Sequence, residues 1–211
     1  MSNVTTIDTK TDTKTQILDT TERLIAEKGF TTTTLRNIVS EAGVNLSAVS
    51  YHFGSKEELF RAVVHRIAVP VTKRQLQMLE QLRQKTSTPS VEDLLTAFLT
   101  PPLEFVMGDE HYRIIRAQFM GRCRSEPEPI QSIADREFSA SVDSFLDALQ
   151  RALPNQSRSQ LSWKLDLVVA ALVRVQTEAS KPVALLRSSQ PQDIQATLSN
   201  LVKFLAAGMQ A

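Results

Sequence analysis

Apolar residues in this chain recur three and four positions apart over most of its length, and this spacing restricts the possible fold more than any other feature. An α-helix brings such positions onto one face, whereas a half-buried strand needs strict alternation, which few windows show. We count about nine amphipathic segments, no credible sheet and no repeat of fixed period. The predicted fold class is therefore all-α.

Two short helices separated by a tight turn are predicted within residues 34–53. Gly43 supplies the left-handed residue that ends the first helix, and the side chain of Asn45 can cap the second, 46–53. The apolar residues of the second helix lie three or four apart and are expected to point inward: Leu46, Val49 and Phe53.

The outer face of the second helix carries small and polar side chains, so the pair is a helix-turn-helix arrangement. The major groove of B-DNA admits one helix if its side chains are short enough for the backbone to approach. Each of these residues alone is more often a helix cap or a packing residue, but their combined spacing favours DNA contact. The candidate DNA contacts are Thr33, Thr34, Arg36, Asn45, Leu46, Ser47, Ala48, Ser50, Tyr51, His52 and Lys56.

Residues 15–60 resemble the N-terminal DNA-binding domain of the TetR (tetracycline-repressor-like) family of bacterial transcriptional regulators. The resemblance covers roughly a quarter of the chain. It departs from the family pattern at Ser50, where members commonly have a tyrosine, and Tyr51 follows directly. The matching motifs are G-F-T-T-T at 29–33, A-G-V at 42–44, H-F at 52–53 and S-K-E at 55–57.

This resemblance implies a repressor that binds double-stranded DNA as a homodimer and is released by a small-molecule inducer. Two-fold symmetry would place the two recognition helices about 34 Å apart on a palindromic operator. The expected organisation is a disordered tail (1–12), a DNA-binding domain (13–60) and a helical ligand-binding and dimerisation domain (61–211).

The resemblance also implies that the two C-terminal helices form the dimer interface. The segment LDLVVAALVRV, 165–175, is apolar around most of its circumference, which suits an interface. A buried core helix explains this pattern equally well from periodicity alone. The candidate interface residues are Trp163, Leu167, Ala170, Ala171, Arg174, Leu198, Leu201, Val202 and Leu205.

A ligand cavity among the middle helices is the last feature that the resemblance implies. Large apolar side chains could form its wall, although each is individually more often part of an ordinary core. The candidate ligand-binding residues are Phe98, Phe105, Met107, Arg116, Phe119, Met120, Phe138 and Trp163.

Composition narrows the setting. Cys123 is the only cysteine, so no internal disulfide can form, and the polar opening MSNVTTIDTKTDTKT lacks the apolar run of a secretory signal. No segment approaches the length of a membrane span, so we expect a cytoplasmic protein. The formal net charge of +1 does not by itself indicate nucleic-acid binding. Residues 61–85 are basic, but such a stretch is usually a solvated helix face and is weak evidence by itself. We expect positive charge to meet the duplex at Lys56, where a further helix starts.

The competing functions are a helical small-molecule-binding protein and an enzyme, in each case without DNA activity. The sequence contains no glycine-rich phosphate loop, no H-E-x-x-H and no catalytic-triad pattern. The three histidines, His52, His65 and His111, are too scattered to suggest a metal site. We therefore expect neither a metal nor a cofactor.

Overall fold

The computed structural model describes residues 12–107, 110–179 and 194–211, and these form helices without a single strand. The all-α prediction is confirmed. The expected tail, 1–12, lies outside the described residues except for Asp12. The helices are α1 (Thr13–Lys28), α2 (Leu35–Ala42), α3 (Leu46–Phe53), α4 (Lys56–Lys85), α5 (Val91–Met107), α6 (Glu110–Ser125), α7 (Ile130–Ala152), α8 (Arg158–Ala179) and α9 (Ile194–Gln210).

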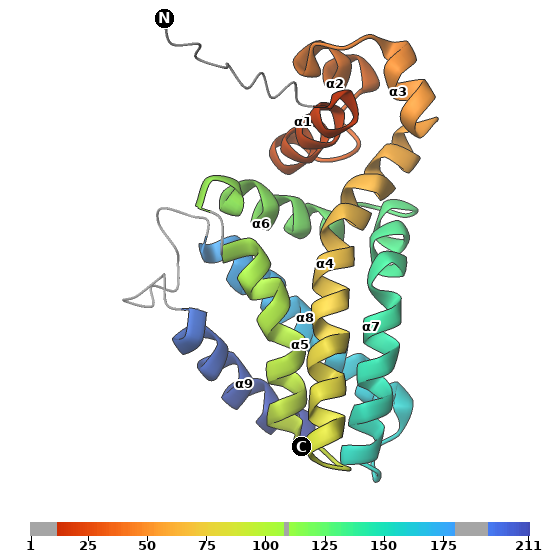
Figure 1. Ribbon diagram of the computed structural model, residues 1–211. Helices are drawn as coiled ribbons and strands as arrows, with labels where there is room; N and C mark the ends of the chain where they lie inside the picture. Colours follow the sequence, from red (N-terminus) through yellow and green to blue (C-terminus); the bar gives the residue numbers. More distant parts are fainter. Residues whose placement is uncertain (1–11, 108–109, 180–193) are drawn as a thin grey trace, which may run out of the picture.

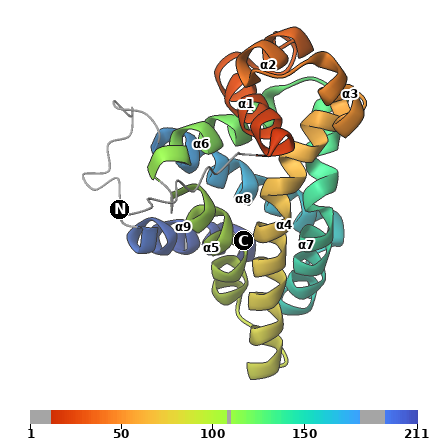
Figure 2. The same cartoon turned by 45° about the horizontal axis from the view of Figure 1, so that its top comes forward.

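The first three helices lie together at one end of the molecule, and α4 runs from them along the body (Figure 1). Helix α6 crosses beneath α1 and packs against it, while α5 and α7 flank the length of α4. Helix α9 packs on α5, as the turned view also shows (Figure 2). No helix in the described ranges combines the length and the apolar character that a membrane crossing needs.

The apolar core around α1–α3 continues into the body of the protein. Ile17 and Leu24 of α1, Val49 of α3 and Phe60 of α4 are fully buried in one cluster. Phe119 of α6 belongs to the same cluster, and its ring centroid lies 5.8 Å from that of Phe60. The unit of helices α1–α3 is therefore packed directly onto α6.

Side-chain caps set the bounds of α2 and α3. The hydroxyl of Thr34 accepts a hydrogen bond from Asn37 N at 3.1 Å, and the Asn37 side chain accepts one from the Thr34 N–H. Asn45 Oδ1 accepts from Ala48 N at 2.8 Å, as predicted. Gly43 ends α2 in the left-handed region, with φ of 65°, where a side chain would be strained.

The sequence predicts a break in α5 at Pro101 and Pro102, but the helix runs through both prolines. Proline lacks an N–H, so Pro102 cannot donate the helical hydrogen bond to the carbonyl of Phe98. Gln75 Nε2 from α4 donates to that carbonyl instead, at 2.7 Å. A neighbouring helix thus satisfies the acceptor that the proline leaves open, and α5 continues.

The basic segment lies along the body of the protein, mostly as an exposed helix face. Residues 61–85 belong to α4, which leads away from α3 toward the opposite end of the molecule (Figure 1). Near its start, Arg66 pairs with Asp19 and Glu22 of α1, both at 2.5 Å. The positive charge of this segment therefore pairs with a neighbouring helix or faces solvent along the body.

Candidate DNA-binding surface and ligand cavity

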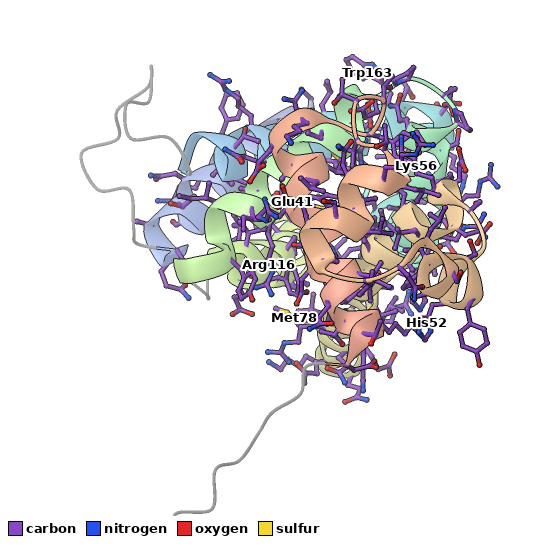
Figure 3. The ribbon with its side chains drawn as sticks, turned by 90° about the horizontal axis from the view of Figure 1, so that it is seen from above. Glu41, His52, Lys56, Met78, Arg116 and Trp163 are labelled. Atoms are coloured by element: carbon purple, nitrogen blue, oxygen red, sulfur yellow. The ribbon has the colours of Figure 1, made fainter. Side chains whose placement is uncertain are left out.

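Helix α3 is fixed by its inner side and exposed on its outer side. Val49 is fully buried, whereas Tyr51 is 85% exposed, and Ser47, Ser50 and His52 are exposed as well. Figure 3, which looks onto α1–α3, shows His52 at the rim of the molecule. The exposed face is the arrangement that docking into a groove requires, because polar groups point out and the helix cannot rotate.

Leu46 departs from the inward direction expected for it. Its side chain is 48% exposed, since it occupies the first turn of α3, beyond the helices that cover Val49. Ala48 is half-buried. Leu46 and Ala48 remain predicted DNA contacts.

The neighbouring residues of α2 add a second exposed edge. Thr34 and Arg36 are exposed at the start of the helix, and Asn45 is exposed at the turn. Glu41, near the end of α2, pairs with Arg23 of α1 at 2.9 Å, so one acidic charge on this surface is partly neutralised (Figure 3).

Thr33 does not belong to this surface. Its side chain is fully buried, and its hydroxyl donates to the carbonyl of Gly29 at 2.7 Å. A group enclosed in this way cannot reach a phosphate, so Thr33 is removed from the predicted contacts. Its hydrogen bond stabilises the turn between α1 and α2.

Lys56 is partly enclosed at the start of α4. Its Nζ donates to the carbonyl of Phe30 at 2.6 Å and lies 4.0 Å from the centroid of the Phe30 ring. Burial lowers the pKa of Lys56, against the opposing effects of Glu57 and Glu126. The ammonium therefore has a structural partner in addition to its predicted DNA contact.

A cavity opens among the helices of the body. The cavity volume is about 80 Å³. Its lining comes from α4, α5, α6, α7 and α8 and is mostly apolar. The lining residues are Ile67, Val71, Gln75, Phe98, Pro102, Phe105, Val106, Met120, Cys123, Arg124, Ala134, Asp135, Phe138, Ser141, Val142, Val169, Leu172, Val173 and Gln176.

Half of the predicted ligand-binding residues line this cavity: Phe98, Phe105, Met120 and Phe138. Arg116 is not in the lining and stacks on Phe105, with its guanidinium carbon 4.6 Å from the ring centroid. The side chain of Met107 lies outside the described residues.

Two predicted wall residues lie elsewhere. Phe119 is fully buried in the cluster beneath α1, because it is on the face of α6 that turns toward Phe60. Trp163 is 64% exposed, and Figure 3 shows it at the edge of the molecule, well away from Arg116. Periodicity identified both as large apolar positions but could not tell which neighbour each one faces.

The two glutamines of the lining were not identified from the sequence. Gln75 interrupts the apolar row Ile67, Val71 and Leu79 on α4, and Gln176 of α8 is 3% exposed. A glutamine inside an apolar stripe, together with a Pro-Pro pair on another helix, was the available signal. No group of three metal-ligating side chains occurs in the described part of the chain.

The end of α6 connects the cavity to the turn that follows α1. Arg124 lines the cavity and pairs with Asp166 of α8 at 3.3 Å and with Asp135 of α7 at 3.7 Å. Two residues further on, Glu126 Oε1 accepts from the backbone N–H of Phe30 at 2.7 Å. A shift of residues 124–126 would therefore change both the cavity wall at Arg124 and the contact with the Phe30 backbone.

The predicted dimer residues divide by helix. On α8, Trp163, Leu167, Ala170 and Arg174 are exposed and Ala171 is half-buried. On α9, Leu201 is half-buried, but Leu198, Val202 and Leu205 are buried in the core beside α5. The prediction of these three as interface residues is wrong, because they belong to the core of the protomer. The exposed apolar side chain on α9 is Phe204, which is 78% exposed.

Two family models match the chain. The model described as "Bacterial regulatory proteins, tetR family" matches residues 17–63, and "Tetracyclin repressor-like, C-terminal domain" matches residues 96–208. The second match alone spans more than half of the chain. It covers the α5–α9 region, to which the resemblance in residues 15–60 did not extend.

Two individual proteins of similar sequence are also transcriptional regulators. The chain is 23% identical over 164 residues to the HTH-type transcriptional repressor BepR of Brucella suis biovar 1 (strain 1330), across 77% of this chain and 76% of that protein. It is 48% identical over 46 residues to the HTH-type transcriptional regulator YerO of Bacillus subtilis (strain 168), across 22% of this chain and 16% of that protein. These relatives are regulators and not enzymes.

Solved structures share the fold. The fatty acid degradation regulator FadR from Bacillus halodurans has a TM-score of 0.63 at 15% identity, with 96% of each chain covered. FadR from Bacillus subtilis, solved in complex with stearoyl-CoA, has a TM-score of 0.58 at 15% identity, with 92% of this chain and 97% of that chain covered.

Proposed function

Since the chain belongs to the TetR family of bacterial regulatory proteins, we propose that it is a cytoplasmic repressor that binds a palindromic operator as a homodimer and leaves it when a small molecule fills the cavity. The observation that carries the proposal is the two-sided character of α3. Its buried Val49 holds the helix in place, while Tyr51 and His52 face outward without covering. We treat residues 13–60 as the DNA-binding domain and 61–211 as the ligand-binding and dimerisation domain.

The proposed DNA contacts are of two kinds. On the exposed face of α3, the short side chain of Ser47 allows the helix to lie close to base edges. The longer side chains of Tyr51 and His52 can contact bases or phosphates further from the helix. Arg36 and Lys56 supply positive charge toward phosphates. Specificity would come from α3, and salt-dependent affinity from the two cations.

The proposed dimer interface joins the exposed faces of α8 and α9. Leu167, at 46% exposure, and Phe204 leave apolar surface in contact with solvent, which a second copy would cover. A two-fold axis through this surface presents two identical recognition helices to a palindromic site. The three corrected α9 residues support the interface from behind.

The proposed release step starts from Arg124. A ligand that enters the cavity contacts this side chain or its partner Asp135, disturbs the ion pairs of Arg124 with Asp135 and Asp166, and so displaces the end of α6. Glu126 transmits the displacement to the backbone at Phe30. A ligand lowers operator affinity only to the extent that it binds the displaced arrangement more tightly than the DNA-bound one.

A mobility-shift assay with DNA from around the protein's own gene tests the operator proposal. We expect a discrete complex, and selection from random DNA should yield an inverted repeat with half-sites one helical turn apart. A screen of metabolites for a rise in Tm, followed by the same shift assay, then tests release. Long-chain acyl-CoA belongs in the screen because the similar FadR of Bacillus subtilis was solved with stearoyl-CoA.

The alternative is a helical small-molecule-binding protein that does not act on DNA. The cavity supports it as well as it supports a repressor, but it assigns no role to the exposed polar face of α3. Failure to retain any DNA, from the genomic region or from the random pool, together with clear ligand binding, would favour this alternative.

A further inference from the structure

One residue that lines the cavity carries a buried acceptor without a donor. Gln75 of α4 is 3% exposed and lines the cavity, and its Oε1 receives no hydrogen bond from any described residue. Leaving such an oxygen without a partner is unfavourable, and a donor delivered by a ligand would remove that penalty.

The orientation of this amide is fixed by the proline in α5. The Phe98 carbonyl can accept but not donate, so the Gln75 group that faces it at 2.7 Å has to be the NH₂ group. The carbonyl is available because Pro102 has no N–H to offer. Gln75 therefore cannot turn its amide over, and Oε1 remains an acceptor.

The charged lining residues neutralise each other. Arg124 faces Asp135 at 3.7 Å, and Asp166 of α8 shares the same guanidinium at 3.3 Å. An anionic ligand would have to displace these carboxylates, and a cationic ligand would have to displace Arg124. The remaining described walls are apolar apart from Gln75, Ser141 and Gln176.

We propose that the cavity selects an uncharged, largely apolar molecule that carries one hydroxyl or N–H donor, and that Gln75 Oε1 accepts this donor. The apolar walls provide most of the affinity, and the single acceptor provides orientation and selectivity. This inference rests on the proposed function, in which the same cavity holds the effector.

Gln176 offers a matched comparison. Like Gln75 it is 3% exposed, lines the cavity and donates its Nε2 to a carbonyl of α5, that of Pro102 at 2.9 Å. Its Oε1 is not among the buried atoms left without a partner. The two glutamines thus share the bond to an α5 carbonyl, and of the two only the Gln75 oxygen combines full burial with the lack of a described donor.

The test uses the full chain and three probes with the same ring system: 2-naphthol, 2-methoxynaphthalene and 2-naphthoate. Titration calorimetry gives the Kd of each probe. Naphthol should bind about five- to tenfold more tightly than its methyl ether, which cannot donate, the typical effect of one hydrogen bond. Naphthoate, which is charged, should bind most weakly.

Variants assign the preference to one side chain. Gln75→Met keeps the length of the side chain, removes Oε1 and should bring the Kd of naphthol and its ether together. Gln176→Met frees an α5 carbonyl in the same way and should keep the preference. The wild-type comparison needs neither variant, so it decides the matter even if a variant fails to fold.

Equal affinity for naphthol and its ether in the wild-type protein overturns the inference, as does tighter binding of naphthoate. Failure of both neutral probes to bind also overturns it. Loss of the preference in both glutamine variants would show that wall geometry, rather than Oε1, creates it. None of these results touches operator binding, which the mobility-shift assay measures separately.

Discussion

Glu126 Oε1 accepts a hydrogen bond from the backbone N–H of Phe30 at 2.7 Å, joining residues 96 positions apart in the sequence. Gly29 makes the approach possible, because a Cβ at this position would lie 2.6 Å from the same carboxylate oxygen. Gly29 also has φ of 84°, which side chains rarely adopt. The turn after α1 is thus attached to the segment that follows α6.

Glu126→Ala should lower the free energy of unfolding by about 1–2 kcal/mol, since it leaves the partly buried Phe30 N–H without its charged acceptor. It should also weaken the effect of an effector on operator affinity. Urea denaturation measures the first change. Glu128→Ala is the control, because Glu128 is exposed and its carboxylate accepts a local hydrogen bond from Ser132, four residues further along. Equal losses in both variants would remove the special role of Glu126.

Tyr51→Ala and His52→Ala should each weaken operator binding by roughly 1–3 kcal/mol and leave Tm unchanged. Both side chains are exposed, so their removal costs the fold little. Fluorescence anisotropy with labelled operator gives the affinity. Arg83→Ala, exposed near the far end of α4, should bind like the wild type. A matching fall in Tm for Tyr51→Ala would identify it as a packing residue instead.

Lys56→Ala and Arg36→Ala should both weaken binding to all DNA sequences and flatten its dependence on salt, because each removes one cation near phosphates. They should differ in stability. Lys56 also holds the Phe30 carbonyl at 2.6 Å, so only its replacement should lower Tm. Salt titrations and thermal melts separate the two effects. An unchanged salt slope in both variants would place neither side chain at the DNA.

Leu167→Arg should convert the proposed dimer to monomers, since two-fold symmetry brings the new charge into an apolar interface and close to its symmetry mate. Val69→Arg is the matched control, because Val69 of α4 is 47% exposed and Leu167 is 46% exposed. Sedimentation equilibrium reports the mass of each variant. Dimers that persist in Leu167→Arg, or a wild type that is monomeric, would contradict the proposed α8–α9 interface.

The sequence by itself determined the helical class, the cap at Asn45 and the polar outer face of α3. These are local properties: 3.6-residue periodicity, a side-chain oxygen beside a backbone N–H, and the type of residue at each position. The local contacts are the same wherever the helix is placed, so a single sequence suffices to predict them.

Only the tertiary structure decided which apolar residues line the cavity and which fill the core. Phe119 and Phe138 look alike in sequence, but α6 turns Phe119 toward Phe60 while α7 turns Phe138 into the cavity. The same holds for Gln75, whose role depends on a carbonyl that Pro102 leaves open on another helix. Such assignments follow from the rotation and crossing of helices, which are set by packing between distant segments and have no period in the sequence.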